Sequence, residues 1–499
     1  MTVWFGAAFD TAYMLWFWIP GVVWALAMGF RNWIDMLGLG FMVSTLTANL
    51  LFLATYALGQ PEAFVGALRW VTALSLLASL LVVKRDALQL VIPVGAALAL
   101  SSVGAIARNV FRLDGWLGEY DHVFTAFSSQ LIQAGQLTDR VIDEAVYKKG
   151  LAFPVIMALG RDGLLLGSTP IVIFGLLIVV TYRLAQLVAP DKKQWLITTS
   201  WATVMVMWMS AQMFWGLPFY QHGHVMLALA SGVCLLLVMH FAEQPVVSWP
   251  MTAALAITSA VVTQSRFEAF VLAFFLTVPV LWSMRAKTSS WRGQFHSIAV
   301  SLAWPFSFSL WVVTLGNFPV DGVSVPLIVF LACAGALIAA TVLYWLPVLR
   351  NVLIHLSWMV LLVLTTAYLL YARPGGLDWV AFSANTFEGE GAWGGFWWMP
   401  LAAVILLLVI RKTPQERLVF WLTVIFLLVT VLIKATDGIT DERFGTIRIG
   451  WGDSVNRSLF HSFAPVTTLL VIALSRTIHA IVEVVGPRKV GRRSIPART

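Results

Sequence analysis

Long, nearly uninterrupted apolar runs occupy most of this 499-residue sequence, and they restrict the chain to one class of fold. Many of the runs approach the ~20 residues that an α-helix needs to cross the hydrocarbon core of a bilayer. Apolar residues make up 60% of the chain and charged residues 11%, whereas a soluble domain has roughly 25% charged residues. A water-soluble globule of this length cannot bury so much apolar surface. The sequence therefore predicts a multi-span membrane protein.

The expected fold is an all-α, polytopic transmembrane helix bundle with about 13 to 15 spans. The runs are continuously apolar over lengths at which barrel strands would alternate. The short pairs at 249–284 and 397–434 are the least regular. The predicted spans are 13–30, 34–58, 63–83, 88–107, 168–188, 195–215, 223–242, 249–264, 266–284, 297–315, 325–345, 351–371, 397–410, 417–434 and 459–484.

The distribution of basic residues predicts the orientation of the bundle. No Lys or Arg precedes the first run, and Arg31 follows it; a signal peptide has the opposite polarity, so we expect a retained span with the N-terminus outside. Strict alternation then puts Lys84, Arg85 and the basic tail in the cytoplasm, as the positive-inside rule requires. This rule accounts for the net charge of +8 without a nucleic-acid partner.

The chain divides into spans, outer segments and a tail, with no long soluble domain. Cys234 and Cys333 each lie inside an apolar run, which gives no support for a disulfide or a metal site. The predicted parts are N-terminal helices at 1–87, a transmembrane module at 88–484 with outer loops at 108–167, 373–397 and 436–457, and a basic cytoplasmic tail at 485–499.

The first outer loop contains an amphipathic pattern. From Asp121 onward, Val123, Phe127, Leu131 and Ala134 recur at steps of three and four residues. This periodicity predicts a helix that lies in the plane of the membrane interface.

Acidic residues gather at the start of this predicted helix. Glu119, Asp121 and His122 stand where the positive end of a helix dipole can hold an anion. Asp121 can also act as the N-cap, and Asp114 is a loop or turn residue. Carboxylates beside an apolar surface can serve as a general base or bind a divalent ion that helps a phosphate depart. The spacing alone supports neither role over the other.

Two further places carry ionisable residues at the ends of spans. Arg266 and Glu268 lie between two predicted spans in TQSRFEAF, as a functional pair or as a structural salt bridge in a tight hairpin. His222 and His224 stand at the mouth of a span. Residues two apart do not share a helix face, so interfacial hydrogen bonding is favoured over metal binding.

The start of the last span carries the fourth group. Arg457 lies about one turn inside the membrane near Asn456 and His461. A lipid-facing arginine there is costly, so its side chain points into the bundle or snorkels outward. Guanidinium geometry suits a phosphate well.

Together these four places resemble the GT-C superfamily of integral-membrane glycosyltransferases, whose donors are polyprenyl-phosphate sugars. Residues 118–122 (Gly-Glu-Tyr-Asp-His) are similar to the family pattern Asp-Glu-Tyr/Phe-x-His, with Gly118 in place of the first acid. Residues 266–268 look like its Arg/Lys-x-Glu motif, and 456–461 are similar to its Asn-Arg-x-x-x-His stretch. The opening spans resemble those of actinobacterial-type members.

The resemblance implies inverting transfer of a sugar from a polyprenyl-phosphate donor to a glycan, glycolipid or protein acceptor. The reaction would take place at the outer face of a bacterial plasma membrane, in cell-envelope assembly. Asp121 or Glu119 would act as the base, and a divalent cation remains open as a cofactor. Arg457, Arg266, Lys148 and Lys149 would bind the donor phosphate.

Two other classes of protein remain as alternatives. An O-antigen polymerase or ligase also has many spans and long outer loops rich in Arg and His, but uses diphosphate-linked donors. A lipid or sugar transporter would place paired, Gly/Pro-interrupted spans in corresponding halves. No such pairing is evident, and the acids lie in a loop and not at mid-membrane.

Overall fold

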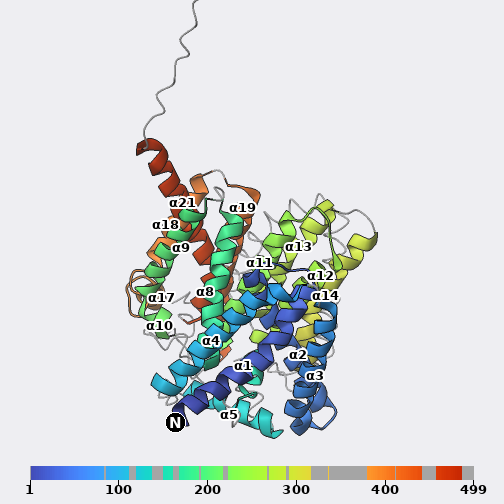
Figure 1. The fold of residues 1–499 in the computed structure, drawn as a ribbon. Helices are drawn as coiled ribbons and strands as arrows, with labels where there is room; N and C mark the ends of the chain where they lie inside the picture. Colours follow the sequence, from blue (N-terminus) through green and yellow to red (C-terminus); the bar gives the residue numbers. More distant parts are fainter. Residues whose placement is uncertain are drawn as a thin grey trace, which may run out of the picture.

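The protein is described by a computed structural model, in which regular structure within the described residues is helical, with no β-strand. Six helices in that part of the chain are long and apolar enough to cross a membrane. The chain is therefore a polytopic helical membrane protein (Figure 1). The structure describes residues 2–83, 86–111, 120–136, 150–160, 168–189, 193–216, 223–266, 269–287, 291–315, 335, 379–410, 412–440 and 457–485.

The apolar runs predict the helices well. Thirteen of the fifteen predicted spans coincide with helices, and the other two, 325–345 and 351–371, lie outside the described residues apart from Gly335. The α-helices are α1 (Thr2–Ala27), α2 (Trp33–Ala57), α3 (Phe64–Val83), α4 (Val91–Phe111), α5 (Tyr120–Ala134), α7 (Ala152–Met157), α8 (Ser168–Val188), α9 (Gln194–Met209), α10 (Gln212–Gly216), α11 (Gly223–Glu243), α12 (Trp249–Ser265), α13 (Ala269–Lys287), α14 (Trp291–Leu315), α17 (Trp379–Thr386), α18 (Trp398–Val409), α19 (Pro414–Thr440) and α21 (Phe463–Val485), and short 3-10 helices are η1 (Pro61–Ala63), η2 (Ala87–Leu90) and η8 (Leu459–Ser462).

One predicted span is divided into two helices. The run 195–215 forms α9 and α10, separated at Ser210, whose hydroxyl donates to the carbonyl of Met207. The chain turns there because the amide of Met213 donates to the carbonyl of Ala392, 2.8 Å away, in a distant part of the sequence. No glycine or proline marks this break in the sequence.

Two helices continue into predicted outer loops. The helix α4 reaches Phe111, and its last turn is held by Asp10 of α1, which accepts from Arg108 and Asn109 at 2.9 Å each. The helix α19 likewise reaches Thr440, inside the loop predicted from 436. Each extension contains polar or charged residues, so these two helices end beyond their apolar runs.

The first two helices cross with their backbones almost in contact. A Cβ atom at Gly21 would lie 1.9 Å from the carbonyl oxygen of Gly40, and one at Gly40 would lie 2.5 Å from the amide nitrogen of Val22. Small residues permit such close approach between membrane helices. The indole of Trp18 adds a hydrogen bond to the carbonyl of Leu37 at 3.0 Å. The α1–α2 pair is thus a rigid support on one side of the bundle.

The helix α11 occupies the centre of the bundle. It packs against α8, α12, α13 and α21, and nearly all of its side chains are buried. The short helices η8 and α7 meet its beginning. A polar side chain in the first turn of α11 is therefore enclosed by several elements.

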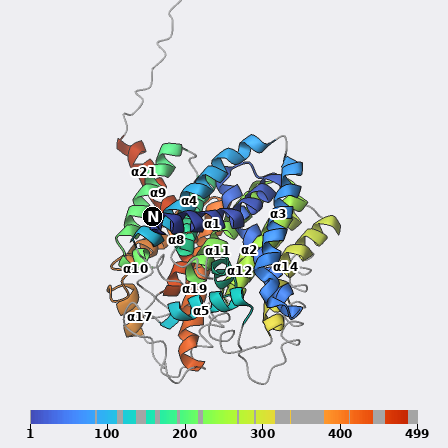
Figure 2. The same ribbon diagram turned by 60° about the horizontal axis from the view of Figure 1, so that its bottom comes forward.

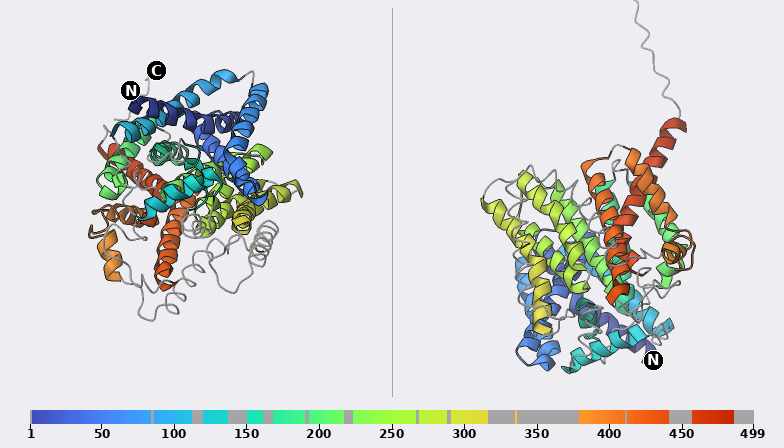
Figure 3. Two further views of the ribbon diagram at one scale, coloured as in Figure 1. Left: turned by 90° about the horizontal axis from the view of Figure 1, so that it is seen from below. Right: turned by 180° about the vertical axis from the view of Figure 1, so that it is seen from behind.

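The helix α5 lies across one end of the bundle, as Figure 2 and the left panel of Figure 3 show. We call this the α5 end. The N-terminus lies at the same end, and α21 extends toward the other (Figure 1). The predicted amphipathic helix therefore forms, and it runs across the long helices and not along them.

Ionisable groups inside the bundle are paired near the opposite end. Asp35, at the start of α2, accepts from Arg183 Nε at 3.2 Å, and His240 Nε2 lies 2.8 Å from its other oxygen. Asp35 is 4% exposed. Burial of a carboxylate is costly unless charged partners compensate it, so these groups join α2, α8 and α11.

A second buried carboxylate joins α19 to α21. Glu416 accepts from Arg476 Nε at 2.7 Å. It also forms a capping box with Thr413: the Thr413 amide donates to Glu416 at 2.7 Å, and the Glu416 amide donates to the Thr413 hydroxyl at 3.2 Å. One side chain thus begins α19 and pairs the two helices.

Aromatic rings fix the position of η8. Trp208 of α9 stacks on Phe396, with ring centroids 3.8 Å apart, and meets Phe463 at 4.7 Å. Its indole donates to the hydroxyl of Thr467 at 2.9 Å. Phe460 of η8 contacts Phe463 in turn, at 4.9 Å. The Gly- and Trp-rich predicted loop at 373–397 therefore contributes buried rings that hold the start of the last helix.

We expect Glu416→Ala to lower the stability of the protein by about 3 kcal/mol, because it leaves the Arg476 guanidinium without its buried carboxylate. Thermal unfolding in a fixed detergent measures the effect. Glu390→Ala, at an exposed position, is the matched control. Equal melting temperatures for the two variants would contradict a stabilising role for the pair.

Candidate functional site

Two histidines from distant parts of the chain meet at the α5 end. His224 lies in the first turn of α11, and His461 lies in η8. The distance between Nδ1 of His224 and Nε2 of His461 is 2.8 Å, and the two rings stack with their centroids 4.9 Å apart. Both side chains are buried, at 2% and 1% exposure.

Arg266 extends this pair. Its Nη1 atom lies 3.4 Å from Nε2 of His224, and the residue is 5% exposed. The backbone at Arg266 is extended (φ −163°, ψ 156°), which ends α12, and the amide of Ala269 donates to its carbonyl as α13 begins. The helix α12 ends at Ser265 and α13 begins at Ala269, and between them the Arg266 side chain reaches His224 of α11.

The direction of donation along this Arg–His–His cluster follows from the chemistry of arginine. A guanidinium only donates, so Nε2 of His224 must accept. A neutral imidazole carries its single proton on the other nitrogen, so Nδ1 of His224 donates to Nε2 of His461. His461 then carries its own proton on Nδ1.

Arg457 stands four residues before His461 in the sequence, just before η8, and is half-buried. Because η8 is a 3-10 helix with about three residues per turn, this spacing does not place the two side chains on one face. The Arg–His–His cluster itself brings donors and a positive charge into an apolar setting, which favours an anionic group such as a phosphate.

The end of α12 is supported by the segment 150–160. The amide of Leu151 donates to the carbonyl of Gln264 at 2.8 Å. Gly150 has φ +84°, and a Cβ atom there would lie 1.8 Å from the carbonyl oxygen of Ser265. Only glycine fits both the conformation and the space. The contact fixes the backbone immediately before Arg266.

A buried amide pair lies beside this contact. The side chain of Asn49 in α2 donates to the side chain of Gln264 at 2.7 Å, and both residues are fully buried. This pair ties the end of α12 to α2. Arg266 therefore follows a helix end that is held from two sides.

The inner side of α5 carries both hydroxyl groups and an apolar side chain. Thr125, Ser128, Ser129 and Ile132 are buried, whereas Phe127 is 48% exposed and Gln130 is exposed as well. Gln133 donates to the carbonyls of Ala158 and Gly160, at 3.1 and 2.9 Å. These hydrogen bonds attach α5 to the segment 150–160.

Of the predicted site residues, His224, Arg266 and His461 come together, and Arg457 stands four residues before His461 in the sequence. Asp121 and His122 lie in the first turn of α5, which begins at Tyr120. Their side chains lie outside the described residues, as do the whole residues Asp114, Glu119, Lys148, Lys149, His222, Glu268 and Asn456.

Metal ligands do not gather within the described ranges. No group of three or more His, Cys, Asp or Glu side chains there could hold an ion. The carboxylates for which a divalent cation remains open, Glu119 and Asp121, have no described side chains. The structure therefore does not test whether a divalent cation binds at these carboxylates.

Sequence reasoning missed the residues that support the cluster. Asn49 and Gln264 each lie inside a predicted span, as do Asp35 and Arg183. A polar or charged side chain within an apolar run was the available signal, because such a group needs a buried partner. The identity of the partner is not encoded nearby: Asn49 and Gln264 are 215 residues apart.

Comparison with known proteins adds no family to this description. No protein-family model, curated protein or solved structure matches the chain.

We expect the two histidines to be energetically coupled. His224→Phe or His461→Phe alone should cost about 1–3 kcal/mol, because each leaves a buried ring nitrogen without its partner. The double variant should cost about 1 kcal/mol less than the sum, since stacked rings remain. Thermal unfolding of the four proteins in one detergent gives the cycle, and strict additivity would argue against the pair.

Gly150→Ala should destabilise the protein by more than about 2 kcal/mol, because it combines a clash with the Ser265 carbonyl and a strained backbone. Gly95→Ala is the control, since an added Cβ in α4 meets nothing within 4 Å. Thermal unfolding compares the two. A Gly150→Ala protein as stable as the control would show that the segment is free to move away from α12.

Proposed function

We propose that this chain is a GT-C-type glycosyltransferase that moves a sugar from a polyprenyl-phosphate donor to an outer-face acceptor in a bacterial plasma membrane. The observation that carries the proposal is the buried Arg–His–His cluster, Arg266–His224–His461, at the end of an apolar bundle. A permanent cation enclosed there is suited to a lipid-linked phosphate, which arrives through the membrane and leaves with added negative charge.

The transfer requires one bond to form and one to break. The acceptor hydroxyl oxygen attacks the anomeric carbon, and the bond from that carbon to the phosphate oxygen breaks with inversion. The electron pair leaves on the phosphate, and the hydroxyl proton goes to a carboxylate, Asp121 or Glu119. Arg266 and Arg457, with Lys148 and Lys149, would stabilise the departing phosphate.

The position of α5 supports this assignment of roles. Its first turn contains Asp121, and near its end Gln133 donates to carbonyls of the segment 150–160. That segment contacts α12 next to Arg266. A base on α5 and a phosphate at Arg266 would thus lie on elements connected by one short segment.

The two histidines favour one rival function. In an O-antigen polymerase or ligase with a diphosphate-linked donor, an Arg–His cluster would bind the diphosphate, and the acids of the first outer loop would not act as the base. The two functions therefore differ in the donor and in the effect of removing those acids.

The decisive assay incubates the purified full-length protein with radiolabelled polyprenyl-phosphate sugars and an extract of envelope acceptors, and measures released polyprenyl phosphate. We expect Asp121→Asn or Glu119→Gln to reduce release by about 10²-fold or more, the usual contribution of a general base. Arg266→Lys should reduce it about tenfold or more, because an ammonium lacks the guanidinium fork. Glu390→Gln should not change it.

Parallel reactions with polyprenyl-diphosphate sugars separate the alternatives. Release from diphosphate donors alone, unchanged in both acid variants, would favour the polymerase or ligase. No release from any donor would remove the glycosyltransferase proposal and leave a transporter.

A further inference from the structure

Two neighbouring cavities lie between α1 and α3, apart from the Arg–His–His cluster. One has a volume of about 390 Å³ and reaches Leu159, and the other has about 260 Å³ and extends to Met28. Phe17, Leu68 and Thr72 line both. The two cavities therefore adjoin, and we call them together the α1–α3 groove.

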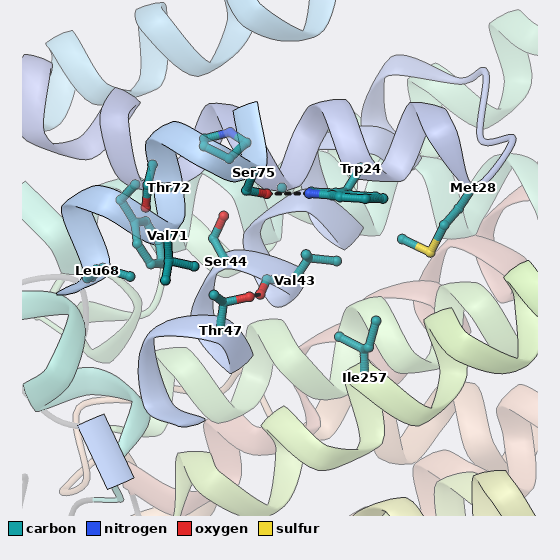
Figure 4. A pocket seen from close by; sticks show the side chains of 13 residues that line it. Trp24, Met28, Val43, Ser44, Thr47, Leu68, Val71, Thr72, Ser75 and Ile257 are labelled. Atoms are coloured by element: carbon teal, nitrogen blue, oxygen red, sulfur yellow. Dashed lines mark hydrogen bonds between the residues drawn. The ribbon is translucent and has the colours of Figure 1, made fainter. Parts of the chain in front are cut away.

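The lining of the groove suits a hydrocarbon chain. Apolar and aromatic side chains predominate, and its hydroxyl groups include two that are already bonded within the protein. The indole of Trp24 donates to the hydroxyl of Ser75, as Figure 4 shows, and the hydroxyl of Thr47 donates to the carbonyl of Val43 at 2.8 Å. These polar atoms do not require a polar ligand.

One charged side chain stands in the groove. Among the described residues that line the two cavities, Arg69 is the only one of the Asp, Glu, Lys, Arg and His types, and within the described ranges it forms no ion pair. It lies near the beginning of α3, toward the α5 end, and is exposed. An arginine in this setting is matched by the phosphate of a lipid headgroup.

The length of the groove selects the kind of lipid. Along α3 it extends from Val65 to Ser75, and ten residues of α-helix span about 15 Å. The hydrocarbon core of a bilayer is about 30 Å thick, so the groove covers about one leaflet. One acyl chain of a bilayer phospholipid fits this depth, whereas a long polyprenyl chain exceeds it.

We propose that the α1–α3 groove binds one acyl chain of an anionic glycerophospholipid, with the phosphate of the lipid at Arg69. Trp16, which lines the groove, is 44% exposed, so the groove is open on the face from which a lipid enters. The proposal does not depend on glycosyl transfer.

The bound lipid would also support the candidate site. Leu159, at one end of the segment 150–160, lines the groove. Leu151, near the other end, donates to Gln264, two residues before Arg266. A lipid in the groove would restrain Leu159, and through the segment it would restrain Leu151 and its hydrogen bond to Gln264.

Native mass spectrometry of the delipidated full-length protein in detergent tests the proposal. The probes are phosphatidylglycerol, zwitterionic phosphatidylcholine and undecaprenyl phosphate. We expect one tight equivalent of phosphatidylglycerol. Arg69→Gln should weaken its binding about fivefold, the effect of one basic residue near a lipid phosphate. Arg69→Lys should retain most of the affinity.

Two further variants separate shape from general charge. Ala12 lines the groove and is exposed, so Ala12→Trp should fill the groove without disturbing the core, and it should weaken phosphatidylglycerol at least as much as Arg69→Gln. Arg292→Gln removes an arginine elsewhere, on α14, and should leave the affinity unchanged.

Three results would overturn the proposal. The first is an unchanged affinity for phosphatidylglycerol in Arg69→Gln, which removes the charge, or in Ala12→Trp, which fills the groove. The second is equal weakening in Arg292→Gln, which would indicate unspecific attraction. The third is tighter binding of undecaprenyl phosphate that is also lost in Ala12→Trp, which would assign the groove to a polyprenyl chain.

Discussion

A polar group in a membrane bundle must find its partner inside the protein, and this constraint organises the whole structure. Hydrocarbon offers no hydrogen bonds, so each buried charge either joins helices or marks a site of action. Asp35 and Glu416 belong to the first kind: each accepts from an arginine on another helix and holds the bundle together. The same constraint explains why the end of α12 is tied to α2 and to the segment 150–160 before the chain reaches Arg266.

The Arg–His–His cluster differs from those ion pairs in its composition. Its hydrogen bonds join the Arg266 guanidinium to two stacked histidine rings, which orient the positive charge. The rings fix the direction of the guanidinium, and the aromatic cluster around Trp208 fixes the ring of His461 through η8. Such preorganised positive charge is what a departing phosphate requires, and it is the physical basis of the proposed activity.

The sequence predicted the positions of the helices better than the contacts between side chains of distant helices. Apolar runs placed α8 and α11 almost to the residue, because the length of a span is set by the bilayer. The break at Ser210 was missed, since it arises from a hydrogen bond to Ala392 and not from a local signal. His224, Arg266 and His461 were singled out because ionisable residues stand at span ends, but their meeting depends on packing across as many as 237 residues. Gly150 was missed because its role is a close contact with another helix. The role of the acidic residues of the first outer loop as the base stays a prediction.

The helix α5 is attached to the rest of the protein through the segment 150–160, because Gln133 donates to the carbonyls of Ala158 and Gly160. The same segment donates from Leu151 to the end of α12, two residues before Arg266. A displacement of α5 would therefore pass along this segment to the backbone that positions the arginine.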